Sequence, residues 1–244
     1  MSLARRHSML TSKNYGTITL FGSASNPVDN GLTNTSPVAV TPPATMKVGD
    51  LVFMFAVNRE IQANITSILI SNTGGQTWNV LGTFGGTGID PPTVKIFYCV
   101  FNGTWSANPS VAFVTATPVN SVMMHVFRPS NPSNIWYPGV ALTSGTWTDT
   151  SAPFVANITG ITPVSNSNVS IAAWFAGAAV IWSALSGTGW NVLGSAQYRN
   201  LAGGDQSISF AYKVQYSPTA TGDVSKNLDT SGNGITCIFS FYEL

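Results

Sequence analysis

A five-residue string occurs twice in this chain, and the repeat limits the folds that the chain can adopt. The string Trp-Asn-Val-Leu-Gly starts at Trp78 in the first half and again at Trp190 in the second half. Similar segments at a wide spacing indicate a repeated folding unit, and such a repeat is weighed before any other prediction of fold. We therefore expect two copies of one unit, each on the order of 100 residues long.

The segments around the repeated string also correspond. In each half an apolar run precedes the string, an alternating strand with a tyrosine follows it, and a hydrophobic strand closes the half. These segments are 51–57, 94–100 and 122–128 in the first half, and 169–175, 208–214 and 236–242 in the second. Alternation with a period of two is typical of half-buried β-strands, so both copies should fold as sheets.

The remaining sequence predicts strands as well. Val, Ile, Thr, Phe, Trp and Tyr occur in short runs between Gly, Pro, Asn and Ser, a pattern typical of an all-β sandwich or barrel. We predict an all-β fold of two tandem β-sandwich (jelly-roll-like) domains from an internal duplication. The predicted parts are an irregular N-terminal arm (1–15), a first copy (16–130), a linker (131–145) and a second copy (146–244), with 178–184 among the strands of the second copy.

The composition is unusual in its low charge. Charged residues make up 8% of the chain and hydrophobic residues 44%, whereas about 25% of a typical globular protein is charged. Much of the surface must therefore consist of Ser, Thr, Asn and Gly. Such a surface suits a protein that packs against neighbours or is exposed on a particle, and it fits a cytoplasmic metabolic enzyme poorly.

The cations cluster at one place only. The net charge is +1, and the one basic cluster contains Arg5, Arg6 and Lys13 in the N-terminal arm. A phosphate backbone is bound by clustered Lys and Arg, so we expect no nucleic-acid partner. The arm is either a solvated, frayed terminus or a segment that docks on an acidic partner subunit.

Targeting and cysteine signals are sparse. The first thirteen residues are too polar for a signal peptide, and no apolar run approaches the roughly 18 residues that span a bilayer, so no membrane association is expected. Cys99 and Cys237 both fall in predicted strands with hydrophobic neighbours. Buried free thiols are the favoured interpretation, and a disulfide is the alternative.

The aromatic residues fall into two groups. The repeated ones should fill equivalent core positions, although a pair of sugar-stacking platforms is the alternative; they are Trp78, Trp190, Tyr98 and Tyr212. Among the unrepeated ones, Trp174 and Trp182 lie in apolar strands and should be core. Four others lie in polar surroundings or in the linker, where they could be exposed, pack the two copies together, or stack on glycans; they are Trp105, Trp136, Tyr137 and Trp147.

The inventory of reactive side chains argues against catalysis. His125 alternates with apolar residues in a predicted strand, and no Gly-x-Ser-x-Gly elbow supplies a nucleophile for it. The acidic residues are scattered singly, mostly at turns, where Asp50 should cap backbone amides. No cluster has the spacing of a metal site, so we predict no catalytic residues, no metal and no cofactor.

One stretch of the first copy resembles a known family. Lys47-Val48-Gly49-Asp50 leads into a hydrophobic strand, and the turn Gly-x-Thr-Trp-Asn-Val-Leu is followed by an aliphatic strand with a tyrosine. This order resembles a β-sandwich unit common in tailed-bacteriophage virion proteins, which decorate heads, form knobs or fibres, or build tail adhesins. The resemblance covers most of the first copy and the later half of the second, where Asn168-Val169 replaces Gly49-Asp50.

The resemblance implies a non-enzymatic component of the virion that forms a trimer or another cyclic oligomer. The leading hypothesis is a capsid decoration or cement protein that binds the major capsid protein or other virion subunits, assembled in the host cytoplasm and then exposed on the particle. The second is a tail fibre or adhesin whose unrepeated aromatics bind host glycans. The third, an enzyme, would require an exposed His125 beside a carboxylate and a hydroxyl group.

Overall fold

The chain folds into β-strands alone in the part that the structure, a computed structural model, describes: residues 16–26, 36–59, 68–86, 91–113, 119–149, 154–193, 198–199 and 206–244. The predicted all-β fold is therefore confirmed. The strands of the first half are β1 (Thr19–Asn26), β2 (Val38–Ala39), β3 (Leu51–Arg59), β4 (Leu69–Asn72), β5 (Asn79–Gly85), β6 (Pro92–Val100), β7 (Ser110–Ala112) and β8 (Asn120–Arg128). The strands of the second half are β9 (Trp136–Pro138), β10 (Thr143–Asp149), β11 (Phe154–Ile158), β12 (Asn168–Ala176), β13 (Asn191–Val192), β14 (Tyr198–Arg199), β15 (Ser207–Gln215), β16 (Val224–Leu228) and β17 (Gly232–Glu243).

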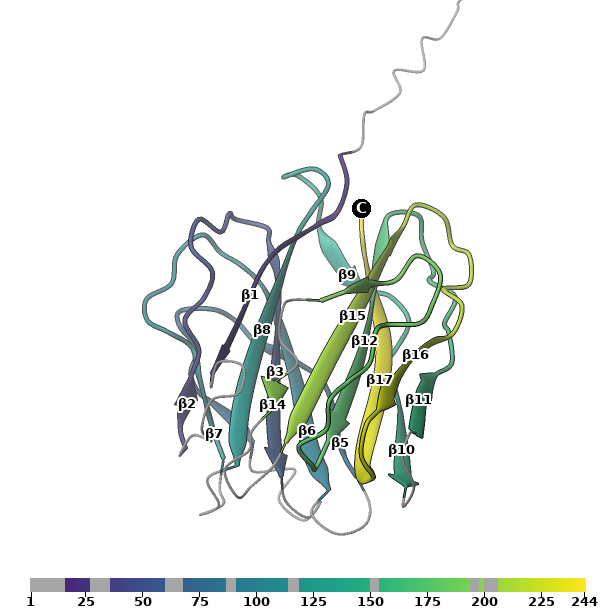
Figure 1. The fold of residues 1–244 in the computed structure, drawn as a ribbon. Helices are drawn as coiled ribbons and strands as arrows, with labels where there is room; N and C mark the ends of the chain where they lie inside the picture. Colours follow the sequence, from purple (N-terminus) through teal and green to yellow (C-terminus); the bar gives the residue numbers. More distant parts are fainter. Residues whose placement is uncertain are drawn as a thin grey trace, which may run out of the picture.

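The strands form four layers (Figure 1). The two inner layers are large antiparallel sheets with the orders β1-β8-β3-β6-β5 and β10-β17-β12-β15-β13, the second of which also holds β9 and β14. A small sheet covers the outside of each large one, with the order β2-β7-β4 in the first half and β11-β16 in the second. Each half is thus a β-sandwich, and the two sandwiches lie with their large sheets towards each other.

Three hydrophobic cores fill the spaces between these layers. The central core lies between the two large sheets and includes Phe53, Phe55, Phe175 and Phe239. The first outer core lies inside the first sandwich, and the second outer core, built around Trp174, lies inside the second. Because both faces of the large sheets are covered, β3 and β12 are buried almost throughout and have continuous apolar sequences.

The two halves have corresponding topologies. The pairs 1-8, 8-3, 3-6 and 6-5 of the first large sheet match 10-17, 17-12, 12-15 and 15-13 of the second, and 2-7 of the first small sheet matches 11-16. Strands that alternate between two facing sheets in this way are typical of a jelly roll. The residues that correspond to β4 touch β16 through two isolated bridges, at Trp182 and Ser186. The correspondence agrees with the predicted duplication, whose common origin stays a prediction.

The central core has matching contacts on its two sides. Tyr98 of the first half packs edge-on against Phe241 of the second, with ring centroids 4.9 Å apart. Tyr212 of the second half packs edge-on against Phe127 of the first, at 5.5 Å. Tyr98 and Tyr212 hold equivalent positions in the two halves, as do Phe127 and Phe241. The halves therefore pack against each other as the two subunits of a twofold dimer do. The segment 131–145, predicted as a linker, contributes β9 and the start of β10 to the second sheet through pairing with β17.

Candidate functional site

Both halves, the linker and the root of the N-terminal arm meet at one end of the molecule, which we call the junction. It comprises the turn 45–50, residues 128–136 and 165–168, and the single residues Ile18, Tyr216 and Glu243. In Figure 1 it is the end at which the C-terminus is marked. The strands β3 and β12 begin here, whereas β8 and β17 end here, because their pairing is antiparallel.

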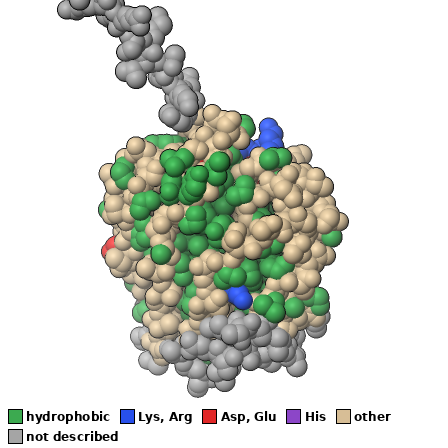
Figure 2. All heavy atoms as spheres, turned by 180° about the vertical axis from the view of Figure 1, so that it is seen from behind, with side chains coloured by type: hydrophobic (Ala, Val, Ile, Leu, Met, Phe, Trp, Pro, Cys, Tyr) green, Lys and Arg blue, Asp and Glu red, His purple; other side chains and the backbone are tan. Residues whose placement is uncertain are grey.

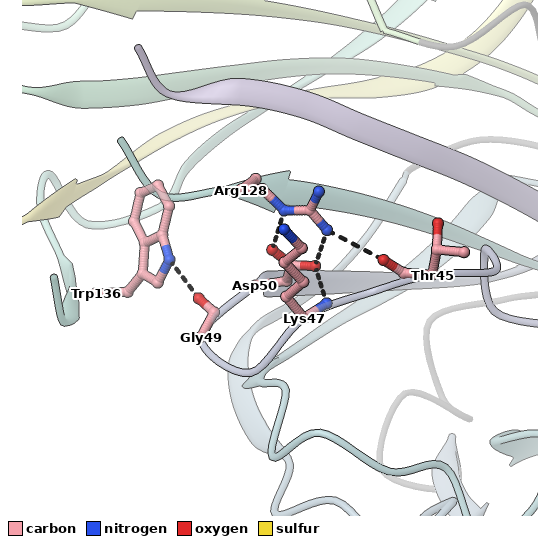
Figure 3. Close-up of polar contacts among 6 residues, drawn as sticks. All are labelled: Thr45, Lys47, Gly49, Asp50, Arg128 and Trp136. Carbon is pink, nitrogen blue, oxygen red and sulfur yellow. Dashed lines mark hydrogen bonds and ion pairs between the residues drawn. The ribbon is translucent and has the colours of Figure 1, made fainter. Parts of the chain in front are cut away.

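A partly buried ion pair closes the first half at the junction (Figure 3). The Arg128 guanidinium donates from Nε to Oδ1 of Asp50 at 3.0 Å and from Nη2 to Oδ2 at 2.9 Å. The Asp50 side chain is fully buried, and its Oδ2 also accepts the Lys47 N–H at 2.7 Å. Two parallel bonds to one carboxylate fix both side chains, so Asp50 closes the turn and also anchors the end of β8.

Trp136 connects this turn to the second half. Its Nε1 donates to the Gly49 carbonyl at 3.0 Å, and its ring is buried in the central core (Figure 3). Gly49 has φ of 91°, a left-handed conformation that favours glycine. Trp136 therefore packs the two halves together, and its burial leaves no exposed face on which a sugar could stack.

Glu243 is the hydrogen-bond acceptor for polar groups of both halves at the junction. Its carboxylate is buried and accepts the Ser130 N–H at 2.8 Å, the Ser167 hydroxyl at 2.6 Å and the Ser130 hydroxyl. A buried carboxylate is stable only when it is hydrogen-bonded in this way. Glu243 thereby joins the end of β17 to Ser130, at the end of the first half, and to the turn before β12.

The root of the arm is attached to the same end. The Ile18 N–H donates to the Tyr216 hydroxyl at 3.1 Å, and Ile18 itself is buried in the central core. Burial raises the pKa of the Tyr216 phenol, and the Glu243 carboxylate raises it further. The hydrogen bond from Ile18 fixes the point at which the chain enters the fold, where the two halves meet.

A shallow cleft of about 540 Å³ opens beside this root. Hydroxyl, amide and carboxylate groups surround it; the described lining is Asn134, Ser165, Asn166, Ser167, Tyr216, Glu243 and Leu244. This set can exchange hydrogen bonds with a polar partner. The Glu243 carboxylate, already engaged by three donors, serves to hold the cleft in shape.

Asn168 replaces Asp50 in the second half. The sequence placed Asn168-Val169 opposite Gly49-Asp50, but the pairing register shifts this alignment by one residue: Leu51 pairs with Phe127 as Val169 pairs with Phe241. Asn168 is fully buried, and its Nδ2 donates to the Ser165 carbonyl at 2.9 Å. The turn before β12 is thus closed by a neutral amide.

His125 and the cysteines lie inside the cores. His125 is 2% exposed, its Nδ1 lies 2.8 Å from the Ser23 hydroxyl, and its ring packs against Phe210 with centroids 4.4 Å apart. Burial lowers its pKa to about 3. Cys99 and Cys237 are free and buried, and burial raises the pKa of both thiols. Among the described residues, no three His, Cys, Asp or Glu side chains lie close enough to hold a metal ion.

The other predicted aromatics pack against neighbours. Trp105 stacks on Phe101 at 5.1 Å, and Trp147 stacks on Phe154 at 6.2 Å. Tyr137 keeps 38% of its surface exposed and stacks on Tyr242 at 5.5 Å.

The repeated aromatics also differ in their surroundings. Trp78 is half-buried against the first outer core, whereas Trp190 is buried in the second. Tyr98 and Tyr212 are partly buried against the central core.

Sequence reasoning missed three residues of the junction, namely Arg128, Tyr216 and Glu243. A weak signal existed for Glu243, because a lone glutamate between apolar strand residues is unusual in a chain with two glutamates. Arg5, Arg6 and Lys13 lie outside the described residues. The described part of the chain contains no helix with the length and hydropathy needed to cross a bilayer.

The comparisons with known proteins were negative: the chain matches no protein-family model, no curated protein and no solved structure.

Proposed function

We propose that this chain is a non-enzymatic structural protein of a bacteriophage particle, namely a decoration or cement protein that binds the head surface through its N-terminal arm. The observation that carries the proposal is the junction, where the root of the arm is fixed between two packed sandwiches. Arg5, Arg6 and Lys13 precede this root in the sequence, and their charges suit docking on an acidic surface of the major capsid protein.

Surface chemistry and burial support the same proposal. The face in Figure 2 displays few charged side chains and a broad area of apolar ones among uncharged polar groups, as expected of a protein that packs against neighbours. His125 is enclosed by the central core, so a substrate in solution could not reach it. The resemblance of the Lys47–Val52 segment to virion proteins agrees with a place on the particle, as a trimer or other cyclic oligomer without nucleic-acid or membrane partners.

The test is binding to capsids that lack the protein. The wild-type chain should sediment with such capsids, and the combined Arg5→Ala, Arg6→Ala and Lys13→Ala changes should weaken binding on the order of tenfold or more, since each lost charge contact contributes up to about 1 kcal/mol. Ser2→Ala, Ser8→Ala and Ser12→Ala together form the matched control, which changes the same arm without changing its charge. Wild-type chains that stay in the supernatant would overturn the proposal.

A tail adhesin that binds host glycans is the second candidate, favoured by one observation. Tyr137 is exposed and stacks on Tyr242, which offers an aromatic surface at the edge of the second large sheet. Aromatic faces of this kind suit the apolar side of a sugar ring. Binding to a glycan array that is lost in Tyr137→Ala would favour this candidate, and an array without hits would exclude it.

A further inference from the structure

The cleft at the junction is lined by polar side chains that the fold does not use. Among them are Asn134, Ser165 and Asn166. The Ser165 hydroxyl and the Asn166 amide have no hydrogen-bond partner among the described residues, and Asn134 donates only from its Nδ2, to the Ser130 hydroxyl at 3.3 Å. Hydroxyl and amide groups both donate and accept hydrogen bonds. These side chains can therefore bind a ligand that carries donors and acceptors together.

The backbone of the cleft walls is already paired within the protein. Ile135 and Leu244 exchange two N–H···O bonds, with N···O distances of 2.9 and 3.1 Å. The carbonyl groups of Ser165 and Ser167 also accept bonds, from a side chain and from a backbone N–H. A peptide that adds as a strand binds through unpaired backbone groups of its receptor. The cleft is thus suited to a ligand that is recognised by side chains instead.

The charges in the cleft point to a neutral ligand. Its described lining contains no lysine or arginine. The Glu243 carboxylate already accepts bonds from Ser130 and Ser167. An anionic ligand would lie near this carboxylate without a counter-ion, and a cationic one would have to displace the donors that stabilise it.

Tyr216 adds an aromatic surface to these polar groups. Its side chain is 47% exposed, and its hydroxyl accepts the Ile18 N–H at 3.1 Å, which holds the ring in place. An aromatic face packs against the C–H groups of a sugar ring, while hydroxyl and amide groups bind the sugar hydroxyls. Because the ring and the walls are fixed before binding, little conformational freedom is lost when a ligand enters.

The backbone of the cleft carries a local strain as well. Ser167 has φ of 55°, a left-handed conformation that is uncommon for residues other than glycine. Its hydroxyl donates to Glu243 at 2.6 Å, which helps to hold it there. Such residues cluster at ligand sites, where the surrounding structure maintains the strain. Ser167 directly follows the unpartnered Asn166.

We propose that the cleft binds a neutral oligosaccharide, with Tyr216 stacked on a sugar ring and with Asn134, Ser165 and Asn166 bonded to sugar hydroxyls. Its volume of about 540 Å³ is within the range of roughly 300–1,000 Å³ that small-molecule sites have. The site is distinct from the Tyr137 surface, because Tyr137 stacks on Tyr242, whose side chain points to the opposite face of β17 from Glu243. The inference goes beyond the proposed structural role and requires neither the arm nor a capsid.

The test begins with a glycan array that carries neutral oligosaccharides of glucose, galactose, mannose and N-acetylglucosamine together with sialylated ones. The full chain should bind neutral members. Isothermal titration with the best of them should show affinity lowered on the order of tenfold or more in Asn166→Ala and in Tyr216→Ala. Tyr216→Phe should keep most of the affinity, because it retains the ring although, like Tyr216→Ala, it loses the bond from Ile18.

Two further variants serve as controls. Asn227→Ala removes an exposed asparagine from β16, outside the described lining of the cleft, and Tyr137→Ala removes the other aromatic surface. Both should bind the sugar like the wild type, and thermal melts should show that Asn166→Ala is folded. An array without neutral hits, binding to sialylated members alone, full affinity in Asn166→Ala, or a loss confined to Tyr137→Ala would each overturn the inference. Capsid sedimentation tests the proposed function separately.

Discussion

The two halves close their junction ends differently on the same strand order. In the first, a charged Asp50 binds the turn residue three positions earlier and pairs with Arg128. In the second, a neutral Asn168 also binds the residue three positions earlier, and no charge is involved. In both halves a side-chain bond to the backbone three positions earlier therefore closes the turn, although Asp50 accepts from an N–H and Asn168 donates to a carbonyl. The ion pair is an addition that fixes β8 beside β3 where the chain leaves for the linker.

The halves also differ where they meet in the central core. His125 pairs with Phe53 on β3, and Phe239 occupies the matching place beside Ile171 on β12. The first half thus places a polar ring where the second places an apolar one. Ser23 binds the Nδ1 of the imidazole, whereas its buried Nε2 has no hydrogen-bond partner among the described residues. The central core tolerates this asymmetry.

The largest effect is expected at Phe53, which packs against Phe239 and Phe241 with centroids 5.3 and 5.1 Å away. Phe53→Ala should lower the free energy of unfolding by about 3–5 kcal/mol, because it leaves a cavity between the halves. Urea denaturation followed by fluorescence measures this loss. Leu69→Ala, at a side chain that is 55% exposed, is the control and should change stability by less than about 0.5 kcal/mol.

The effect of Arg128→Ala on stability should be the next largest. It leaves the buried Asp50 carboxylate without its counter-ion, which costs about 3 kcal/mol. Because the second half closes the corresponding turn without a charge, adding Asp50→Asn to Arg128→Ala should recover part of the lost stability. A double-mutant cycle by urea denaturation tests this, and an additive outcome would contradict the account of the ion pair.

His125→Phe should alter the pH dependence of stability. The pKa of His125 falls from its ordinary value of 6.5 to about 3 on folding, so the unfolded chain binds a proton between these values that the folded chain does not. Stability therefore falls as pH drops from 6.5 towards 3, by about 2 kcal/mol at pH 5. The urea midpoint of the wild type should fall between pH 7 and pH 5. The midpoint of His125→Phe should fall less over the same range. Equal falls in the two proteins would contradict a buried neutral imidazole.

The smallest effect separates the repeated tryptophans. Trp78 Nε1 donates to the Thr73 carbonyl at 2.9 Å, whereas Trp190 Nε1 has no acceptor among the described residues. Trp78→Phe should cost about 1 kcal/mol more in hydrogen bonding than Trp190→Phe. Thermal melts of the two variants measure the difference. Equal losses of stability would show that packing alone determines the effect of each substitution.

Much of the sheet framework could be predicted from the sequence. Alternation in 94–100 and 208–214 and the apolar runs at 51–57 and 169–175 correspond to β6, β15, β3 and β12. These strands are long and buried, so hydrophobic pattern alone specifies them. The pattern could not show that the two copies would share a central core, because that requires knowing which face of each sheet turns towards the other half.

Short edge elements were predicted less well. The predicted strand at 178–184 forms only the isolated bridge at Trp182, and β10 begins inside the predicted linker. Edge segments gain few ladder bonds and depend on their neighbours. The junction was missed for a related reason: Asp50 and Arg128, like Ser130 and Glu243, lie far apart in the chain and meet only after both sandwiches have formed.

The central claim is that two sandwiches fold as one body through the core between them. Hydrogen exchange of the Phe53→Ala variant, followed by mass spectrometry, tests it most directly, because the substitution lies in the first half and its partners in the second. The account predicts that protection falls together and by similar factors in β3 of the first half and in β12 and β15 of the second. Wild-type protection in β12 and β15, with loss confined to β3 and its neighbours, would contradict it.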